Sequence, residues 1–152
     1  MEIKTTKQLS KDEKQSIFQI WNEVYPKQIM YKTLDDLENY LAKCTNSVHL
    51  LAKHNGETAA WLCVFDRDGQ RWFALIVDAS FQRQGIGEKM LSKMKTLEDK
   101  VYGWMTPHNR YEKANGEKYL SPKGFYEKHG FAITDEVFDT DILSTVKIVW
   151  QR

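Results

Sequence analysis

The stretch Trp72 to Lys95, WFALIVDASFQRQGIGEKMLSKMK, constrains the fold of this chain more than any other. Its first six residues, Trp72 to Val77, are apolar, β-branched or aromatic, and this run is short enough to favour a buried strand over a helix. From Gly85 onward, apolar residues recur every three or four positions, which predicts an amphipathic helix with a buried face of Ile86, Met90, Met94 and Leu97.

The turn between these two elements, Asp78 to Gly87, has the features of an anion site. It contains no proline, so every residue keeps its N–H group, and Gly85 and Gly87 let a ligand approach the bare peptide nitrogens. Those nitrogens lie at a helix N-terminus, where unpaired N–H groups and the positive end of the helix dipole converge. We therefore predict a phosphate or pyrophosphate site at this turn.

Three phosphate-binding patterns contain glycines at such spacing. A P-loop requires a lysine and a hydroxyl residue after its last glycine, where this chain has Glu88. A dinucleotide fingerprint requires a third small residue where this chain has Met90. The remaining pattern, Q/R-x-x-G-x-G/A, is met by Gln82, Gly85 and Gly87. A tight structural turn without a ligand is the alternative explanation for the glycine pair taken alone.

A second motif follows downstream, SPKGFYEKHGF from Ser121 to Phe131. It predicts a short helix with Ser121 as its cap, Pro122 at its first position and Gly130 as its left-handed exit. Tyr126 in this helix has two interpretations, a core residue with a bonded hydroxyl or a functional group.

The two motifs, in this order, resemble motifs A and B of the GNAT (Gcn5-related N-acetyltransferase) superfamily, and the resemblance covers roughly residues 48 to 131. It implies an α+β, three-layer fold with a twisted, mixed, mostly antiparallel sheet and helices on both faces. It also implies that acetyl-coenzyme A (acetyl-CoA) is the acyl donor, although a longer acyl group is not excluded.

The resemblance also assigns roles to residues. Main-chain groups of Leu75 and Val77 would hold the pantetheine arm of acetyl-CoA, and one of their N–H groups would polarise the thioester oxygen. Tyr126 would protonate the departing thiolate, because tyrosine and thiol pKa values differ by only about 1.5 units. The residues of the turn that would hold the pyrophosphate are Gln82, Arg83, Gln84, Gly85, Ile86, Gly87 and Glu88.

The implied reaction is direct attack of a primary amine, from a small molecule or a peptide, on the acetyl thioester in a ternary complex. Its general base is not identified by the sequence; the candidates, each also explained as a surface or turn residue, are Glu23, Asp66, Asp78 and His108. A non-catalytic acyl-CoA-binding or regulatory module of the same fold is the alternative function.

In this family the first two helices and the loop between them form one wall of the acceptor site. Residues of that wall in this chain include Trp21, Glu23, Tyr25 and Tyr31, and acidic turn residues that would attract a cationic acceptor are Asp66, Asp68 and Asp78. The chain departs from the family pattern at Glu88, where alanine or serine is frequent, at Tyr119, which replaces an asparagine, and at Pro122, which replaces an alanine. These departures put one cofactor contact in doubt.

The remaining patterns predict the other elements. Capping boxes at Ser10 and Thr33 begin two amphipathic helices, and Asn55-Gly56 predicts a hairpin turn. We expect further strands at 1–6, 48–53, 58–65, 101–105, 131–134 and 144–150, with 101–105 parallel to 72–77 through a right-handed crossover and 144–150 showing a half-buried edge pattern. The segment 108–119 is polar and predicts a loop.

Composition limits the possible partners. Lys plus Arg is 22 and Asp plus Glu is 21, so no net charge directs the chain to nucleic acid, and no apolar run is long enough to span a membrane. Cys44 and Cys63 form no metal-ligand pattern, and without a signal peptide they indicate reduced thiols in the cytoplasm. At 152 residues we expect a single domain, 1–152, without a metal. The last strand either pairs across a homodimer or lies within the sheet.

Overall fold

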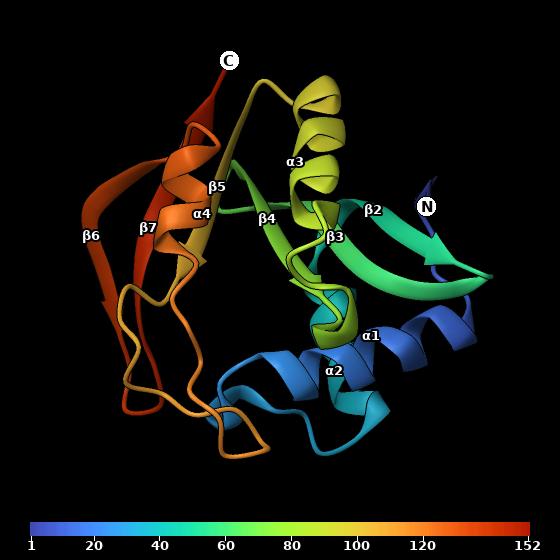
Figure 1. Ribbon diagram of the computed structural model, residues 1–152. Helices are drawn as coiled ribbons and strands as arrows, with labels where there is room; N and C mark the ends of the chain where they lie inside the picture. Colours follow the sequence, from blue (N-terminus) through green and yellow to red (C-terminus); the bar gives the residue numbers. More distant parts are fainter.

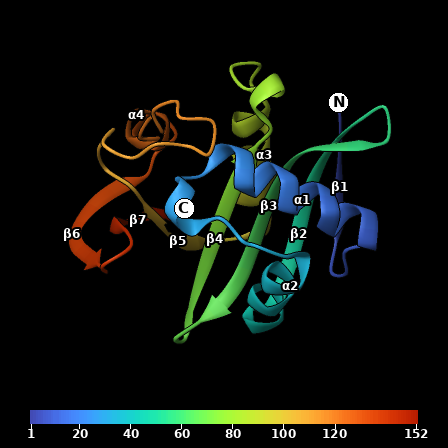
Figure 2. The same ribbon diagram turned by 90° about the horizontal axis from the view of Figure 1, so that it is seen from below.

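The computed structural model describes all 152 residues, which form one twisted seven-stranded sheet flanked by helices (Figures 1 and 2). The strands are β1 (Glu2–Thr6), β2 (Thr45–His54), β3 (Glu57–Arg67), β4 (Gln70–Val77), β5 (Lys100–Met105), β6 (Ala132–Asp139) and β7 (Ser144–Gln151). The helices are α1 (Lys11–Val24), α2 (Leu34–Lys43), α3 (Ile86–Leu97) and α4 (Lys123–Lys128), with short 3-10 turns η1 (Lys27–Ile29) and η2 (Ala79–Phe81).

The order across the sheet is β1-β2-β3-β4-β5-β7-β6, and only β4 and β5 are parallel. The two faces of the sheet bury separate cores. Side chains alternate along β3, so Leu62 packs under α3 with Met90, while Trp61 packs under α1 with Ile17. Helices α1 and α2 cover one face and α3 and α4 the other. This arrangement confirms the α+β fold with helices on both faces.

Glu13 closes the capping box of helix α1 and also joins this helix to the sheet. Ser10 Oγ accepts a hydrogen bond from the Glu13 amide at 3.1 Å, and Glu13 Oε1 accepts one from the Ser10 amide at 2.9 Å. The buried Glu13 also pairs with Lys4 of β1 at 2.8 Å and Lys53 of β2 at 2.9 Å. Burial acts to raise the pKa of Glu13, but these hydrogen bonds and cations outweigh it and hold the pKa at about 2.

Strands β4 and β5 pair at a single position, Trp72 with Tyr102, and then diverge (Figure 1). Beyond Trp72, β4 continues to Val77 in register with β3 alone. The parallel pairing confirms the prediction, and the divergence leaves one side of β4 without a partner strand.

The main-chain groups on that open side can be identified from the register. The Asp78 amide donates to the Ala59 carbonyl at 2.9 Å, directly after the Ala60–Val77 pair. Because hydrogen-bonded and non-hydrogen-bonded pairs alternate along antiparallel strands, the N–H and C=O groups of Leu75 and Val77 point away from β3, towards β5.

The structure differs from the predictions in the place of one strand and in the bounds of several elements; for example, β2 begins at Thr45 and β6 extends to Asp139. The segment predicted as an edge strand, β7, lies inside the sheet between β5 and β6, and β6 forms the edge. Strand β3 runs to Arg67 because it stays paired with β4 up to the Arg67–Gln70 pair. Helix α4 begins one residue later than predicted, with Pro122 as its N-cap, while the Ser121 hydroxyl accepts from the Lys123 amide at 3.3 Å.

Candidate active site

The turn after β4 presents a row of free backbone amides. Arg83 and Gly85 both have left-handed φ values, 64° and 80°, which turn successive N–H groups outward. None of the six amides from Arg83 to Glu88 has a hydrogen-bond acceptor within the protein. They lie at the N-terminus of α3, where the helix dipole favours an anion.

The glutamines of this turn hold its shape. Gln82 Nε2 donates to the Val77 carbonyl at 3.0 Å, and Gln84 Nε2 donates to the Ser80 carbonyl at 3.2 Å. Asp78 accepts from the amide of Ser80 at 2.9 Å and caps η2. The side chains of the motif therefore bond to the turn itself and leave its amides open.

The second glycine of the turn brings the two motifs together. A Cβ on Gly87 would lie 3.1 Å from a ring carbon of Phe125, so a larger residue there would require Phe125 of α4 to shift by a few tenths of an ångström. Phe125 in turn packs against Tyr126, with ring centroids 5.3 Å apart.

A cavity of about 490 Å³, here called the turn cavity, lies between this turn, the end of β4 and α4. It is bounded by every turn residue from Gln82 to Glu88 except Gln84, and by Leu75 and Val77. Those residues were all predicted to bind the cofactor. One acidic residue, Glu88, and two basic residues, Arg83 and Lys128, lie along its wall.

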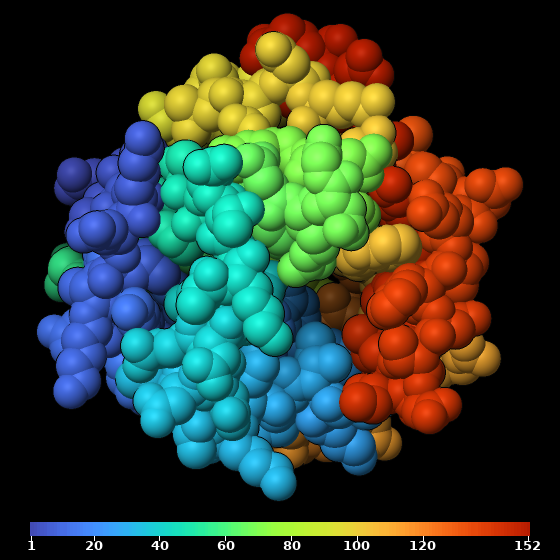
Figure 3. All heavy atoms as spheres, turned by 180° about the vertical axis from the view of Figure 1, so that it is seen from behind, coloured from blue at the N-terminus to red at the C-terminus, as the bar shows by residue number.

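A second cavity of about 230 Å³, here called the aromatic cavity, lies on the side of β4 nearer α1 and α2. Figure 3 shows the hollow on this face, between the blue α1–α2 segment, the green β3–β4 strands and the red β6–β7 hairpin. The aromatic and charged residues that line it are Trp21, Tyr25, Tyr40, Phe65, Arg67, Trp72, Phe73, Trp104, Tyr119 and Tyr126.

The two cavities meet at five residues that line both of them. These residues are Tyr25, Leu75, Tyr119, Pro122 and Tyr126. The hydroxyl groups of the three tyrosines make no hydrogen bond to the protein. Burial, with a smaller contribution from Tyr119, raises the pKa of Tyr126 above its usual range, and burial raises the pKa of Tyr119 to about 12.

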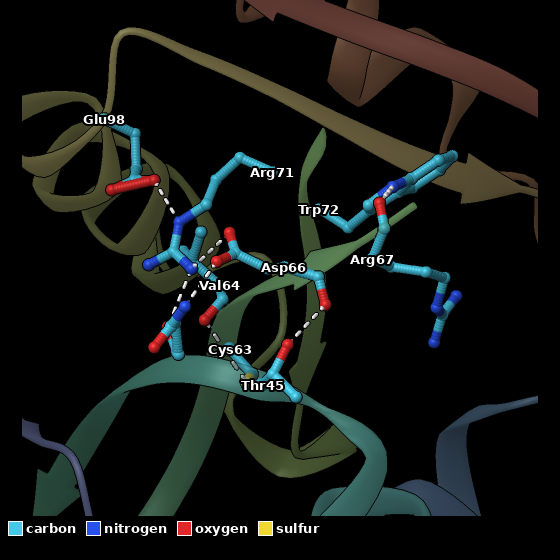
Figure 4. Close-up of polar contacts among 9 residues, drawn as sticks. Thr45, Cys63, Val64, Asp66, Arg67, Arg71, Trp72 and Glu98 are labelled. Carbon is cyan, nitrogen blue, oxygen red and sulfur yellow. Dashed lines mark hydrogen bonds and ion pairs between the residues drawn. The ribbon is translucent and has the colours of Figure 1, made fainter. Parts of the chain in front are cut away.

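None of the four candidate bases lines either cavity. Glu23 and Asp78 line a separate surface groove beside α1. Asp66 accepts from Asn46 at 2.7 Å and pairs with Arg71 at 3.1 Å, and these contacts lower its pKa (Figure 4). His108 Nδ1 accepts from a backbone amide at 3.1 Å, its Nε2 is buried without a partner, and burial lowers its pKa.

The predicted wall of the acceptor site is partly present. Trp21 and Tyr25 line the aromatic cavity, whereas Tyr31 packs behind Trp21, with ring centroids 5.0 Å apart. The sequence reasoning missed four wall residues from strands, Phe65, Arg67, Trp72 and Trp104. The alternation of β3 already puts Phe65 and Arg67 on one face, but the divergence of β4 from β5 that opens this face has no signal in the sequence.

Two structural properties bear on other classes of site. No group of three or more His, Cys, Asp or Glu side chains is placed to hold a metal ion. No helix has the length and apolarity needed to cross a bilayer.

The model of the acetyltransferase (GNAT) domain family matches residues 45–133, so the chain belongs to the GNAT acetyltransferase family. It is accordingly an acetyltransferase that uses acetyl-CoA, and the row of free amides beside the turn cavity fits the pyrophosphate of that molecule. A comparison with curated protein sequences finds no match.

Solved structures share the whole fold at low identity. An aminoglycoside 6'-N-acetyltransferase complexed with coenzyme A is 13% identical with a TM-score of 0.74, covering 99% of this chain and 97% of that one. An acyl-CoA N-acyltransferase from Pseudomonas aeruginosa is 18% identical with a TM-score of 0.70, covering 98% of each. The ribosomal-protein-S18-alanine N-acetyltransferase from Escherichia coli is 14% identical with a TM-score of 0.67, covering 99% and 94%.

Proposed function

We propose that residues 1–152 form a single N-acetyltransferase domain that moves an acetyl group from acetyl-CoA to a primary amine of a small molecule or peptide. The observation that carries this proposal is the meeting of the two cavities at Tyr126. A donor in the turn cavity and an acceptor in the aromatic cavity would form a ternary complex, in which the amine attacks the thioester directly.

The turn cavity would hold the donor mostly through backbone groups. The amides from Arg83 to Glu88 would bind the pyrophosphate, and the outward main-chain groups of Leu75 and Val77 would bind the pantetheine arm. The Val77 carbonyl already accepts from Gln82, which leaves the Val77 N–H and both Leu75 groups for this contact. Either N–H would stabilise negative charge on the thioester oxygen.

Tyr126 is the proposed general acid. Bound acetyl-CoA supplies an activated acetyl group whose carbon–sulfur bond breaks as the carbon–nitrogen bond to the amine forms. The Tyr126 hydroxyl donates its proton to the departing sulfur, and the proton that the neutral amine nitrogen loses on acylation restores this hydroxyl, so the proton balance closes. The raised pKa of Tyr126 keeps this hydroxyl protonated also in alkaline solution, and it makes the difference from the thiol pKa larger than the difference of about 1.5 units expected from the sequence.

The amine must lose its ammonium proton before it attacks. The aromatic cavity offers no carboxylate or imidazole for this step, and the raised pKa values of Tyr25 and Tyr119 make their tyrosinate forms scarce. We therefore assign this proton to water at the cavity mouth. The same absence of a base is the one observation that favours the alternative, a non-catalytic acyl-CoA-binding module.

Calorimetric titration with acetyl-CoA, with coenzyme A and NADH as controls, tests the donor site first. We expect binding of acetyl-CoA and coenzyme A but not NADH, followed by thiol release when primary amines are added. Binding without thiol release for any amine would favour the non-catalytic module. The absence of heat with either form of coenzyme A would remove the donor assignment.

The edge strand β6 supports a homodimer as a further proposal. Val137, Phe138 and Ile142 on or beside β6 are each more than half exposed, and one side of β6 has no partner strand. Pairing of β6 with its copy would cover these side chains. Sedimentation analysis should find a dimer that Val137→Lys dissociates, and a monomer at all concentrations would contradict the proposal.

A cytoplasmic location is supported by the two thiols. Cys44 and Cys63 are buried and unpaired, and burial raises both pKa values, so the thiols stay protonated and unreactive. Cell fractionation with immunodetection would test this location directly.

A further inference from the structure

The charge of the aromatic cavity is unusual for a site that accepts amines. Fourteen of its nineteen lining residues are hydrophobic, and Arg67 is the only one with a charge. No Asp or Glu side chain lines it. A cation placed in this cavity would find aromatic faces but no carboxylate to neutralise it.

The Arg67 guanidinium has no anionic partner in the protein. It lies over the Phe65 ring, 4.9 Å from the ring centroid, and forms no ion pair or side-chain hydrogen bond. Nearby Arg71 differs, because it pairs with Asp66 at 3.1 Å and with Glu98 at 2.6 Å. Figure 4 shows this contrast, with Arg67 pointing away from the cluster around Arg71.

Two acidic residues near Arg67 have other hydrogen-bond partners. Asp66, its neighbour in β3, turns to Arg71 and Asn46. Asp36 of α2 shares a surface groove with Arg67, but its carboxylate accepts from the Thr33 amide at 3.2 Å as part of a capping box. The guanidinium fork therefore remains available for an anion at the mouth of the aromatic cavity.

Arg67 and Leu75 both line that cavity but lie at different levels along the strands. Arg67 is opposite Gln70, at the start of β4, whereas Leu75, which borders both cavities, is five residues further along the strand. A strand rises about 3.3 Å per residue, so these two levels are about 17 Å apart, and the long Arg67 side chain shortens the gap.

We infer that the acceptor is a hydrophobic amine that carries a carboxylate several bonds away from its amino group. This inference rests on the proposed acetyl transfer. Its simplest members are short peptides with aromatic side chains, whose amino end faces Tyr126 and whose terminal carboxylate binds the Arg67 fork. A tripeptide spans about 10 Å, and the Arg67 side chain would cover the rest of the separation of about 17 Å.

The test compares tripeptide Gly-Phe-Phe with its C-terminal amide, with acetyl-CoA saturating and thiol release measured. We expect amidation to lower kcat/KM by about tenfold to a hundredfold, because it removes a hydrogen-bonded charge pair. Arg67→Met should lower kcat/KM for the free acid by the same factor and leave the amide unchanged. Arg67→Glu should reverse the preference.

Two controls accompany these variants. Arg110→Met removes an exposed arginine that lines neither cavity, and both peptides should be turned over as by the unaltered enzyme. Calorimetry with acetyl-CoA should give the same affinity for Arg67→Met, because Arg67 does not line the turn cavity. An unchanged affinity also shows that the variant is folded.

The outcomes separate the inference from the function on which it rests. Equal rates for acid and amide, or faster acetylation of polyamines such as spermidine, would overturn the inference and leave the acetyltransferase in place. Acetyl-CoA binding with no acetylation of any amine would overturn both the inference and the catalytic proposal. No acetyl-CoA binding would overturn the donor site as well.

Discussion

The turn cavity and the aromatic cavity share five residues yet are built from different parts of the chain. The turn cavity has its free backbone amides on one continuous segment, Arg83 to Glu88, and its other walls come from the end of β4, the end of α1, the loop before α4 and α4 itself. The aromatic cavity is lined by residues from α1, α2, β3, β4, β5 and β7, from the loop before α4, and from α4 itself. Contacts made by backbone groups are kept when side chains are substituted. The turn cavity can therefore keep the same ligand after substitutions, whereas substitutions in the aromatic cavity would change which acceptor it binds.

The strongest test of this difference is Gly85→Trp. Gly85 has a left-handed φ of 80° and open space beside it, so an indole there would fill the turn cavity and strain the backbone. We expect no measurable binding of acetyl-CoA by calorimetry. Gly116→Trp is the matched control, because Gly116 has a φ of 86° and equally open surroundings but lies outside both cavities. Retained binding in Gly85→Trp would refute the pyrophosphate site.

Tyr126→Phe tests the junction of the two cavities. Loss of the proposed acid should lower kcat by about a hundredfold or more and leave the affinity for acetyl-CoA little changed. Tyr25→Phe and Tyr119→Phe remove hydroxyls at the same junction and should have smaller effects. A rate equal to that of the unaltered enzyme would mean that Tyr126 contributes packing alone.

Trp104→Leu should affect the acceptor and spare the donor. Trp104 stacks on Trp72 with ring centroids 5.3 Å apart in the wall of the aromatic cavity. We expect KM for the acceptor to rise about tenfold, equivalent to about 1.4 kcal/mol of binding. Trp150→Leu, at a buried indole outside both cavities, is the control for loss of stability. A matching change in acetyl-CoA affinity would show that the two cavities are not independent.

Arg83→Met should have a small effect on the donor. The side chain is exposed, and an exposed charge contributes up to about 1 kcal/mol, so acetyl-CoA affinity should fall by at most about fivefold. Calorimetry at two salt concentrations would measure this difference. A loss of a hundredfold would mean that a side chain, and not the backbone, dominates the turn cavity.

The pH profile of kcat should be flat near the usual pKa of tyrosine. A general acid is active below its pKa, and burial raises that of Tyr126, so its protonated form persists above pH 10. We expect no decline in kcat between about pH 8 and 10 when the non-enzymatic thiol release is subtracted. A descending limb centred below pH 10 would assign the acid to another group.

Local signals in the sequence were sufficient to predict the strand, turn and helix that border the turn cavity. The glycines, the absence of proline and the change of hydrophobic period at Gly85 all lie within one segment. The structure confirms the strand and the helix expected on either side of the turn, although Leu97, predicted on the buried face, is 45% exposed. The pyrophosphate contacts stay a prediction. The same holds for the capping boxes at Ser10 and Thr33, whose partners are three residues away. Such features depend on neighbours along the chain, and a single sequence contains them.

The aromatic cavity and the sheet edge depend on contacts between distant segments. Trp72 meets Trp104, and β7 inserts between β5 and β6, because of the strand order, which no local pattern specifies. The alternation of Val146, Ile148 and Trp150 predicted burial correctly, but burial alone does not distinguish an inner strand from an edge strand. The four candidate bases lie outside both cavities for the same reason. The sequence shows that their side chains can accept a proton, but it does not show how far they lie from Tyr126.

The single pair between Trp72 and Tyr102 has a mechanical consequence. The sheet has two parts, one made of β1, β2, β3 and β4 and the other of β5, β7 and β6. The only backbone pairing between the two parts is the Trp72–Tyr102 pair. Beyond that pair, only side-chain packing resists sliding of the two parts of the sheet against each other. A ligand that forms hydrogen bonds to Leu75 and Val77 would add backbone contacts at this gap and make the domain more rigid.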